Sequence, residues 1–270
     1  MPYQPRLPTT NHNIGRQRPL QDLVLIGGGL LAILFLVYWL LGFVIDKAIQ
    51  HVSPDLEQQW FGRFATAPTA SPAQQTLQQL TNQLQQCSSV PYPVTVHYVD
   101  ADIANAGVLP SGTMLVYRGL IQKLDSENAL AFVLAHELAH LQHRDHLRGM
   151  GRALVLAVIT STLTGSTGAG QLFLPATELG MAQHSQQREL AADTAALDIL
   201  ACHYGHIGGA EVFFTQMQQQ ESRILPTWFD SHPQLTLRLA ALEQHRQAQG
   251  LLLGPVTPMP AALASKMESP

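Results

Sequence analysis

The sequence has few cysteines and few charged residues, and both shortages narrow the class of protein. Cys87 and Cys202 are the only cysteines among 270 residues, too few for a small disulfide-stabilised scaffold, and they do not form a CxxC pair. The two can form one long-range disulfide or remain free thiols. Charged residues make up 13% of the chain and the net charge is −4, so no basic surface favours nucleic-acid binding.

Hydrophobic residues are plentiful, at 46% of the chain, partly because of one long apolar run. Residues 23–45 read LVLIGGGLLAILFLVYWLLGFVI and carry no charge. A helix of about 23 residues is about 34 Å long, enough to cross a bilayer core of about 30 Å and too long for a typical cleaved signal peptide. The run therefore predicts an uncleaved membrane anchor. Arg6, Arg16 and Arg18 precede it, which favours a cytoplasmic N-terminus and an extracytoplasmic remainder.

The rest of the chain predicts a single α+β domain, mainly helical with a small sheet. Alternating residues at 94–99 and 113–117 favour strands, and DSEN at 125–128 supplies capping residues for a helix. A second apolar stretch, 153–164, is short for a membrane span and favours a buried helix, although it could dip into a bilayer. The predicted divisions are a cytoplasmic tail (1–21), an anchor (22–45), a linker (46–74), the folded domain (75–250) and a disordered tail (251–270).

HELAH, at residues 136–140, carries the clearest chemical signal. Residues four apart lie on one face of a helix, so His136 and His140 can both bind one zinc ion at about 2.0–2.1 Å. Glu137 is about 100° further around the helix, where it can accept a proton from an attacking water and pass it to a leaving amine. The competing interpretation is an ordinary helix with two surface histidines, because HExxH also arises by chance.

A catalytic zinc needs a third protein ligand, and SQQRELAADTAALDIL at 185–200 offers one. Glu189 and Asp193 are four residues apart on a predicted helix. This spacing favours Glu189 as the ligand and Asp193 as a carboxylate that accepts the outer N–H of a ligating histidine. Two solvated carboxylates are the alternative.

The remaining histidines carry weaker signals. His143 and His146 extend the cluster, and we expect them at the surface or at the rim of a cleft. His232 lies in a predicted turn, Ser231-His232-Pro233, before a helix. From there it could donate a hydrogen bond to the oxyanion of a tetrahedral intermediate.

Four segments together resemble a known family: NAGVLPSGTMLVYRGLI, HELAH, RELAADTAAL and SHPQLTLRL, in this order across residues 75–245. They are similar to the membrane-associated zinc metallopeptidases that include the HtpX protease and the CAAX prenyl endopeptidase. Compact anchored bacterial members have the most similar layout. The resemblance implies these roles: zinc ligands His136, His140 and Glu189, catalytic Glu137, Asp193 as a supporting residue or proton donor, and His232 for transition-state stabilisation.

The resemblance also implies how a substrate binds. The strand at 113–117 would be an edge strand that pairs with an extended peptide through main-chain hydrogen bonds. The residues expected to contact the peptide or shape its cleft are Asn105, Thr113, Met114, Leu115 and Val116. Gly107, Val108 and Ser111 depart from the family pattern, which puts substrate preference in doubt but leaves the zinc chemistry intact.

These features together predict a membrane-anchored zinc metalloendopeptidase that acts on peptides or unfolded proteins in envelope quality control. We expect one zinc ion per chain, a single-pass location in a bacterial inner membrane and a periplasmic catalytic domain. One alternative is a chaperone-like or assembly-factor domain that binds peptides with little turnover. Another is a structural metal site with a closed shell of four ligands.

Overall fold

The computed structural model describes residues 19–62, 70–151, 155, 186–210, 213–214, 232 and 235–264. The chain forms two compact units, residues 1–44 and 45–270. Helix α1 (Pro19–Ile49) provides the described part of the first unit, and its last residues, 45–49, belong to the second. By length and composition it is the one helix among the described residues that could cross a membrane, as the apolar run predicted.

The second unit contains a small three-stranded sheet, whose order is β1-β3-β2. Strand β1 (Thr95–Val99) is parallel to β3 (Thr113–Tyr117), and β2 (Ala106–Leu109) is antiparallel to it. The prediction that 113–117 is an edge strand is therefore wrong, because β3 already pairs on both sides. Its side chains are mostly buried, including Met114 and Val116.

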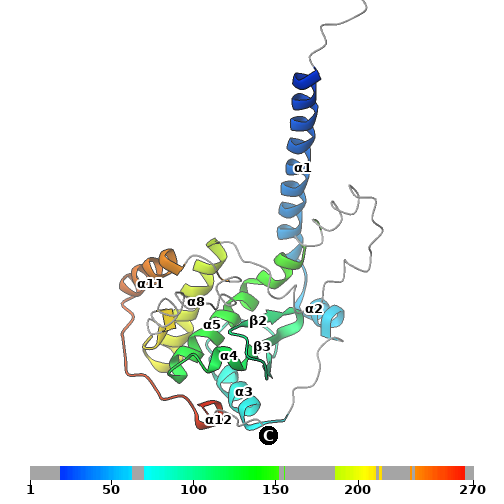
Figure 1. Cartoon of the computed structure of the whole chain (residues 1–270). Coiled ribbons are helices and arrows are strands. Elements are labelled where there is room, and N and C mark those ends of the chain that lie inside the picture. Colours follow the sequence, from blue (N-terminus) through cyan, green and yellow to red (C-terminus); the bar gives the residue numbers. More distant parts are fainter. Residues whose placement is uncertain are drawn as a thin grey trace, which may run out of the picture. The chain divides into compact units, whose positions relative to one another are not determined.

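Helix α5 (Glu127–His143) carries HELAH and lies at the centre of this unit, between the sheet and α8 (Figure 1). It packs against α8 (Gln186–Tyr204), α3 (Pro72–Gln85) and β2, while α11 (Leu235–Gln249) packs on the outer side of α8. Every residue from Asn128 to Leu141 is buried. Helix α8 covers the side of α5 that carries the two histidines, so the alternative of two surface histidines is wrong.

Both ends of α5 are defined by its sequence. Ser126 is the N-cap and its side chain accepts a hydrogen bond from the Ala129 N–H, which confirms the predicted capping stretch. At the other end, Arg144 adopts the left-handed conformation with φ 58°, and its N–H bonds to the carbonyls of the last turn. The chain turns sharply there and continues into Asp145 and His146.

A disulfide joins Cys87, just after α3, to Cys202 in α8, with a Cα–Cα distance of 5.9 Å. The sequence left a disulfide and two free thiols open as alternatives. Because 115 residues separate the two cysteines, the bond closes a long loop around α5 and restricts the unfolded chain.

Three predicted segments differ from the structure or lie outside it. The predicted linker contains a helix, α2 (Pro54–Phe61), whose Glu57 is fully buried. The predicted disordered tail packs against the domain up to helix α12 (Ala261–Ala264). The Glu127 N–H donates to the Thr257 carbonyl, and Leu263 is buried in the core. The apolar stretch 153–164 lies outside the described residues apart from Val155, which is helical and buried.

Candidate metal centre

Four buried side chains bring metal-ligating atoms together inside the second unit. His136 and His140 come from α5, Glu189 from the first turn of α8, and His232 from the segment before α11. Their ligand atoms all lie within 4.8 Å of one another. The three ligands predicted from the sequence are therefore adjacent, although more than 40 residues separate Glu189 from the HELAH motif.

The distances between these donors fit a zinc ion. His140 Nε2 is 3.4 Å from Glu189 Oε1, and His136 Nε2 is 3.5 Å from Glu189 Oε2. Ligands at about 2.0–2.1 Å from a tetrahedral zinc lie about 3.3 Å apart. The two Nε2 atoms are 3.0 Å from each other, slightly closer than this value. Two imidazoles and a carboxylate are also the ligand types that zinc prefers, so the residues fit the ion.

Glu137 lies beside this donor set and is 1% exposed. Its Oε1 has no hydrogen-bond partner in the described part of the chain, although His232 Nε2 lies 3.6 Å away. Burying a carboxylate oxygen without a partner is costly, so such groups occur where a ligand or a reaction uses them. This position agrees with the predicted role of a base that flanks the metal.

His136 is oriented from behind by a buried ion pair. Its Nδ1 lies 2.9 Å from Asp193 Oδ1, as the four-residue spacing from Glu189 predicted. Arg238 in turn holds Asp193 through two hydrogen bonds of 2.7 Å, one to each carboxylate oxygen. Arg238 is fully buried, and it also lies 3.1 Å from Glu189 Oε2 and donates to the His232 carbonyl. One guanidinium thus contacts three of the site's residues.

His140 is oriented by a different carboxylate, that of Asp145. His140 Nδ1 lies 3.0 Å from Asp145 Oδ2, and both side chains are fully buried. Burial opposes protonation, yet the hydrogen bonds with Asp145 and Glu189 raise the pKa of His140 to about 10. Protons therefore compete with a metal ion for the His140 ring, which would bind the metal through Nε2.

The electrostatics of the site favour an ionised Glu189. Burial alone would raise the pKa of this carboxyl group, but His232, His136 and His140 surround it and hold the pKa well below its usual range. Arg238 similarly lowers the pKa of Asp193 despite its burial. Both carboxylates are therefore charged and available, one to a metal and one to the His136 ring.

His232 lies among the metal-ligating residues. Its Nδ1 lies 3.0 Å from Glu189 Oε2 and 3.2 Å from His136 Nε2. Burial lowers the pKa of His232, which favours the neutral ring. A neutral imidazole at this position is able to bind a metal or to donate a hydrogen bond.

Sequence reasoning missed two supporting residues. Arg238 lies within the quoted segment SHPQLTLRL, six residues after His232, and an arginine in an otherwise apolar stretch was the available signal. Asp145 follows His140 by five residues and offered no helical-spacing signal, because the helix ends between them. His146, expected at the surface or a cleft rim, is 4% exposed and contacts Glu57, so that expectation is wrong.

The outer edge of β1 is covered by glutamine side chains from α3. Gln74 binds the main chain of Val96 and Tyr98, and Gln78 binds that of Val94 and Val96. Each amide acts as both donor and acceptor, so the side chains replace a neighbouring strand. A peptide cannot pair with β1 while these bonds are present.

The expected substrate-contacting residues lie on β3 and beside β2. Thr113, Met114 and Val116 are buried, and Leu115 is half-buried in the middle strand. Asn105 precedes β2, and its side-chain oxygen accepts a hydrogen bond from the Ala106 N–H. Of the three described strands, β3 pairs with a strand on both sides, whereas β2 pairs with β3 alone.

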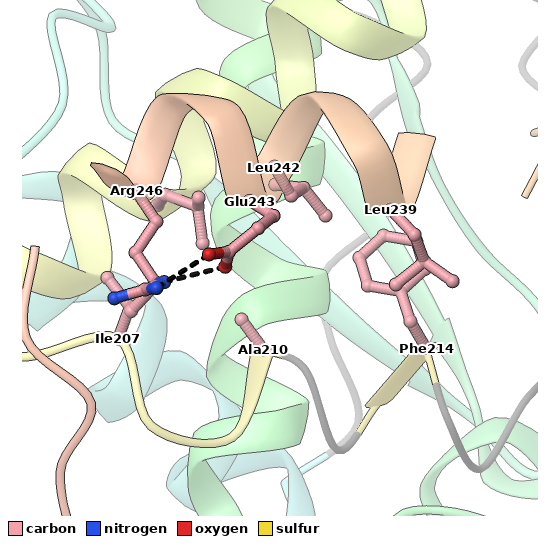
Figure 2. Close-up of a pocket in the computed structure, with 8 residues that line it drawn as sticks. Ile207, Ala210, Phe214, Leu239, Leu242, Glu243 and Arg246 are labelled. Carbon is pink, nitrogen blue, oxygen red and sulfur yellow. Dashed lines mark hydrogen bonds and ion pairs between the residues drawn. The ribbon is translucent and has the colours of Figure 1, made fainter. Parts of the chain in front are cut away.

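A cavity of about 230 Å³ lies elsewhere, between α8, α11 and the segment around Ile207 (Figure 2). Its lining is apolar, with Leu242 and Phe214, except for an ion pair between Glu243 and Arg246. None of the four metal-ligating residues lines it. The cavity is thus separate from the candidate metal centre.

Two histidines of an HExxH helix, a glutamate from a second helix and a flanking buried glutamate define a zinc metallopeptidase site. Comparison with known families agrees: the model of Peptidase family M48 matches residues 71–246. The chain belongs to this family, which confirms the resemblance drawn from the four sequence segments. The family's zinc site is present as His136, His140 and Glu189.

Curated relatives include two kinds of protease. The mitochondrial metalloendopeptidase OMA1 of Danio rerio is 26% identical over 63% of this chain and 38% of its own length, and that of Homo sapiens is 28% identical over 55% and 32%. The beta-barrel assembly-enhancing protease of Yersinia pestis is 33% identical over 35% of this chain and 19% of its own length. The matches thus span less than two fifths of the length of each of these relatives.

Proposed function

We propose that this protein is a membrane-anchored zinc metalloendopeptidase that cleaves unfolded or damaged proteins of the cell envelope. The observation that carries the proposal is the buried set of His136, His140 and Glu189, with the buried Glu137 carboxylate beside it, whose Oε1 accepts no hydrogen bond from the described residues. The relatives named as metalloendopeptidase and protease support the same chemistry.

Each residue of the site has a part in this reaction. Bound zinc supplies a Lewis acid that polarises the scissile carbonyl and makes water more acidic. Glu137 removes a proton from the attacking water and later donates it to the leaving amine. His232 lies 3.6 Å from Glu137 through its Nε2, where it is able to donate a hydrogen bond to the developing oxyanion.

Asp193 acts as a positioning residue in this mechanism. Its carboxylate lies 2.9 Å from Nδ1 of His136, the ring nitrogen opposite the metal-ligating Nε2, and both oxygens accept hydrogen bonds from Arg238. The pair fixes the tautomer and the orientation of the ring. Because Arg238 keeps Asp193 ionised, the geometry favours this supporting role over that of a proton donor.

The substrate would add a strand to β2. The Tyr117 N–H donates to the Asn105 carbonyl, so in the antiparallel ladder the main-chain groups of Ala106 and Val108 face away from β3. Strand β2 also packs beside the zinc helix, whereas the edge of β1 is closed by glutamines. An extended peptide paired with β2 would thus pass close to the metal ligands.

The location follows from helix α1 and the charges beside it. Its apolar residues suit a bilayer, and the three arginines before the helix favour a cytoplasmic N-terminus. We infer a single-pass protein of a bacterial inner membrane whose catalytic domain, from about residue 75 to 250, is periplasmic. Quality control in the envelope is the duty that this location suggests, and the similarity to the beta-barrel assembly-enhancing protease of Yersinia pestis supports a role in the envelope.

The test is cleavage of an unfolded protein, such as reduced and alkylated casein, by the zinc-loaded full chain beside Glu137→Gln. We expect the variant to keep zinc and lose about 10²–10⁴-fold in kcat, because it lacks the base. Binding without cleavage by either protein would favour the chaperone-like alternative. It would also agree with a structural site, in which the four donors close the zinc shell.

A second pair of variants tests the position of the substrate strand. Val108→Pro removes an N–H from the side of β2 that faces away from β3 and leaves the ladder to β3 intact, while Val108→Ala removes similar packing but keeps the N–H. The proline variant should raise KM about five-fold over the alanine variant, the effect of one main-chain hydrogen bond. Equal KM values would contradict pairing at β2.

A further inference from the structure

Glu57 is a fully buried carboxylate in α2, outside the part of the chain that the M48 family model matches. The Ser111 N–H donates to its Oε1 over 2.9 Å, and His146 Nε2 lies 2.8 Å from the same oxygen. Arg144 donates to Oε2 over 2.8 Å, and the Tyr92 hydroxyl lies 3.4 Å from Oε1. Both carboxylate oxygens of Glu57 therefore have partners.

This carboxylate is charged at neutral pH. Burial would raise the pKa of Glu57, but the contacts with His146, Arg144 and the Ser111 N–H outweigh it and lower the pKa to about 2. Each of these partners matters, because removing any one of them would leave the buried charge partly unsatisfied.

Glu57 holds two strained points of the backbone. Ser111 and Arg144 are the two non-glycine residues with positive φ among those the structure describes, at 65° and 58°. Such conformations cost about 1 kcal/mol or more and persist where the surroundings determine them. Here both residues donate hydrogen bonds to the same carboxylate, Ser111 at the turn before β3 and Arg144 at the end of the zinc helix.

The turn at residues 144–146 has Glu57 on one side and a zinc ligand on the other. Arg144 and His146 contact Glu57, whereas Asp145, between them, contacts Nδ1 of His140. Arg144 also donates to the carbonyls of Ile49 and Val52, at the end of α1 and just beyond it. The segment that follows the apolar helix is thus connected to the metal centre by a short chain of contacts.

We propose that Glu57 is a positioning residue of the peptidase: it fixes the Arg144–His146 turn, and through Asp145 it holds the His140 ring in the orientation that binds zinc. This inference rests on the proposed function. The metal centre then depends on a residue close to the anchor, and the catalytic unit begins before the region shared with the family.

The experiment uses the full chain in detergent and compares Glu57→Gln with Asp55→Asn, which removes the same charge from an exposed position of α2. Zinc affinity is measured by competition with a chelator, and the ligand geometry by the visible absorption spectrum of the cobalt-substituted protein. Glu57→Gln should bind zinc about ten-fold more weakly, because loss of outer support weakens metal sites. Its cobalt spectrum should change, and kcat should fall about ten-fold with KM nearly constant.

Asp55→Asn should match the wild type in all three measurements. A folded Glu57→Gln with wild-type zinc affinity and an unchanged cobalt spectrum would overturn the proposal. If Glu57→Gln does not fold, Arg144→Lys replaces it, since lysine keeps the charge but cannot bridge Glu57 and two carbonyls. Unchanged affinity and spectrum in that variant would equally overturn it.

These readouts separate this inference from the proposed function. If the wild type binds zinc but cleaves no protein, the proposed function fails, while zinc affinity and the cobalt spectrum still decide the role of Glu57.

Discussion

The two zinc-binding histidines share one helix but are supported in different ways. Behind His136 stands Asp193, locked by two bonds from Arg238, and all three residues lie within the region shared with the family. Behind His140 stands Asp145, whose arginine partner, Arg148, is 3.3 Å away and partly exposed. This second support continues through neighbouring residues to Glu57, outside the shared region.

The difference shows that a metal site inside the region shared with the family can depend on a residue outside that region. The support of His136 is a compact ion pair between α8 and α11, formed by catalytic-domain helices. The support of His140 is a turn, and turns keep a strained conformation only where their surroundings hold it. We therefore expect loss of the first support to affect folding and loss of the second to affect mainly the metal.

The largest effect should come from Arg238→Met, which keeps the length of the side chain but removes its charge. Asp193 and Glu189 would then remain buried without their cation, so the free energy of unfolding should fall by about 3–5 kcal/mol. Chemical denaturation of the zinc-free protein measures it. Arg246→Met is the control, because Arg246 is paired at the surface with Glu243 and should cost about 1 kcal/mol or less. Equal losses would contradict the comparison.

The next effect is on zinc affinity. Asp193→Asn and Asp145→Asn each remove the carboxylate that orients one histidine, and each should weaken zinc binding about 10–100-fold. Asp198→Asn serves as a control, since Asp198 is exposed on α8 and bound to His245, away from the metal. If only one of the two variants loses zinc affinity, the histidine in contact with the other carboxylate binds zinc without that contact, which would contradict the account.

The smallest effect is the pH dependence of the stability that Glu57, the last residue in the support of His140, contributes. The folded-state pKa of Glu57, about 2, is below the ordinary value of 4.5. Its contribution to stability is therefore complete above pH 4.5 and is lost as the pH falls toward 2. The difference in unfolding free energy between wild type and Glu57→Gln should shrink by about 1–2 kcal/mol over this range. A difference independent of pH would show that the charge is unimportant.

The zinc ligands could be predicted because their signal is local. His136 and His140 are one helical turn apart, and Glu189 and Asp193 show the same spacing, so each pair shares a face wherever its helix lies. The capping stretch before α5 and the apolar run of α1 were equally readable. The family resemblance then joined the segments in the right order.

The supports and the sheet order could not be predicted in this way. The contacts of Glu57 with Arg144 and Ser111 join positions 87 and 54 residues apart, and no periodicity encodes them. The place of 113–117 in the middle of the sheet depends on β1 pairing in parallel with it, a long-range choice. The closure of the β1 edge by glutamine side chains of α3 likewise appears only in three dimensions.

The central claim is that His136, His140 and Glu189 together bind one zinc ion. Metal analysis of the purified full chain, beside Glu189→Ala at equal protein concentration, tests it most directly. We predict about one zinc per wild-type chain and far less in the variant after dialysis against a weak chelator. No zinc in the wild type, or equal zinc in both proteins, would contradict the account.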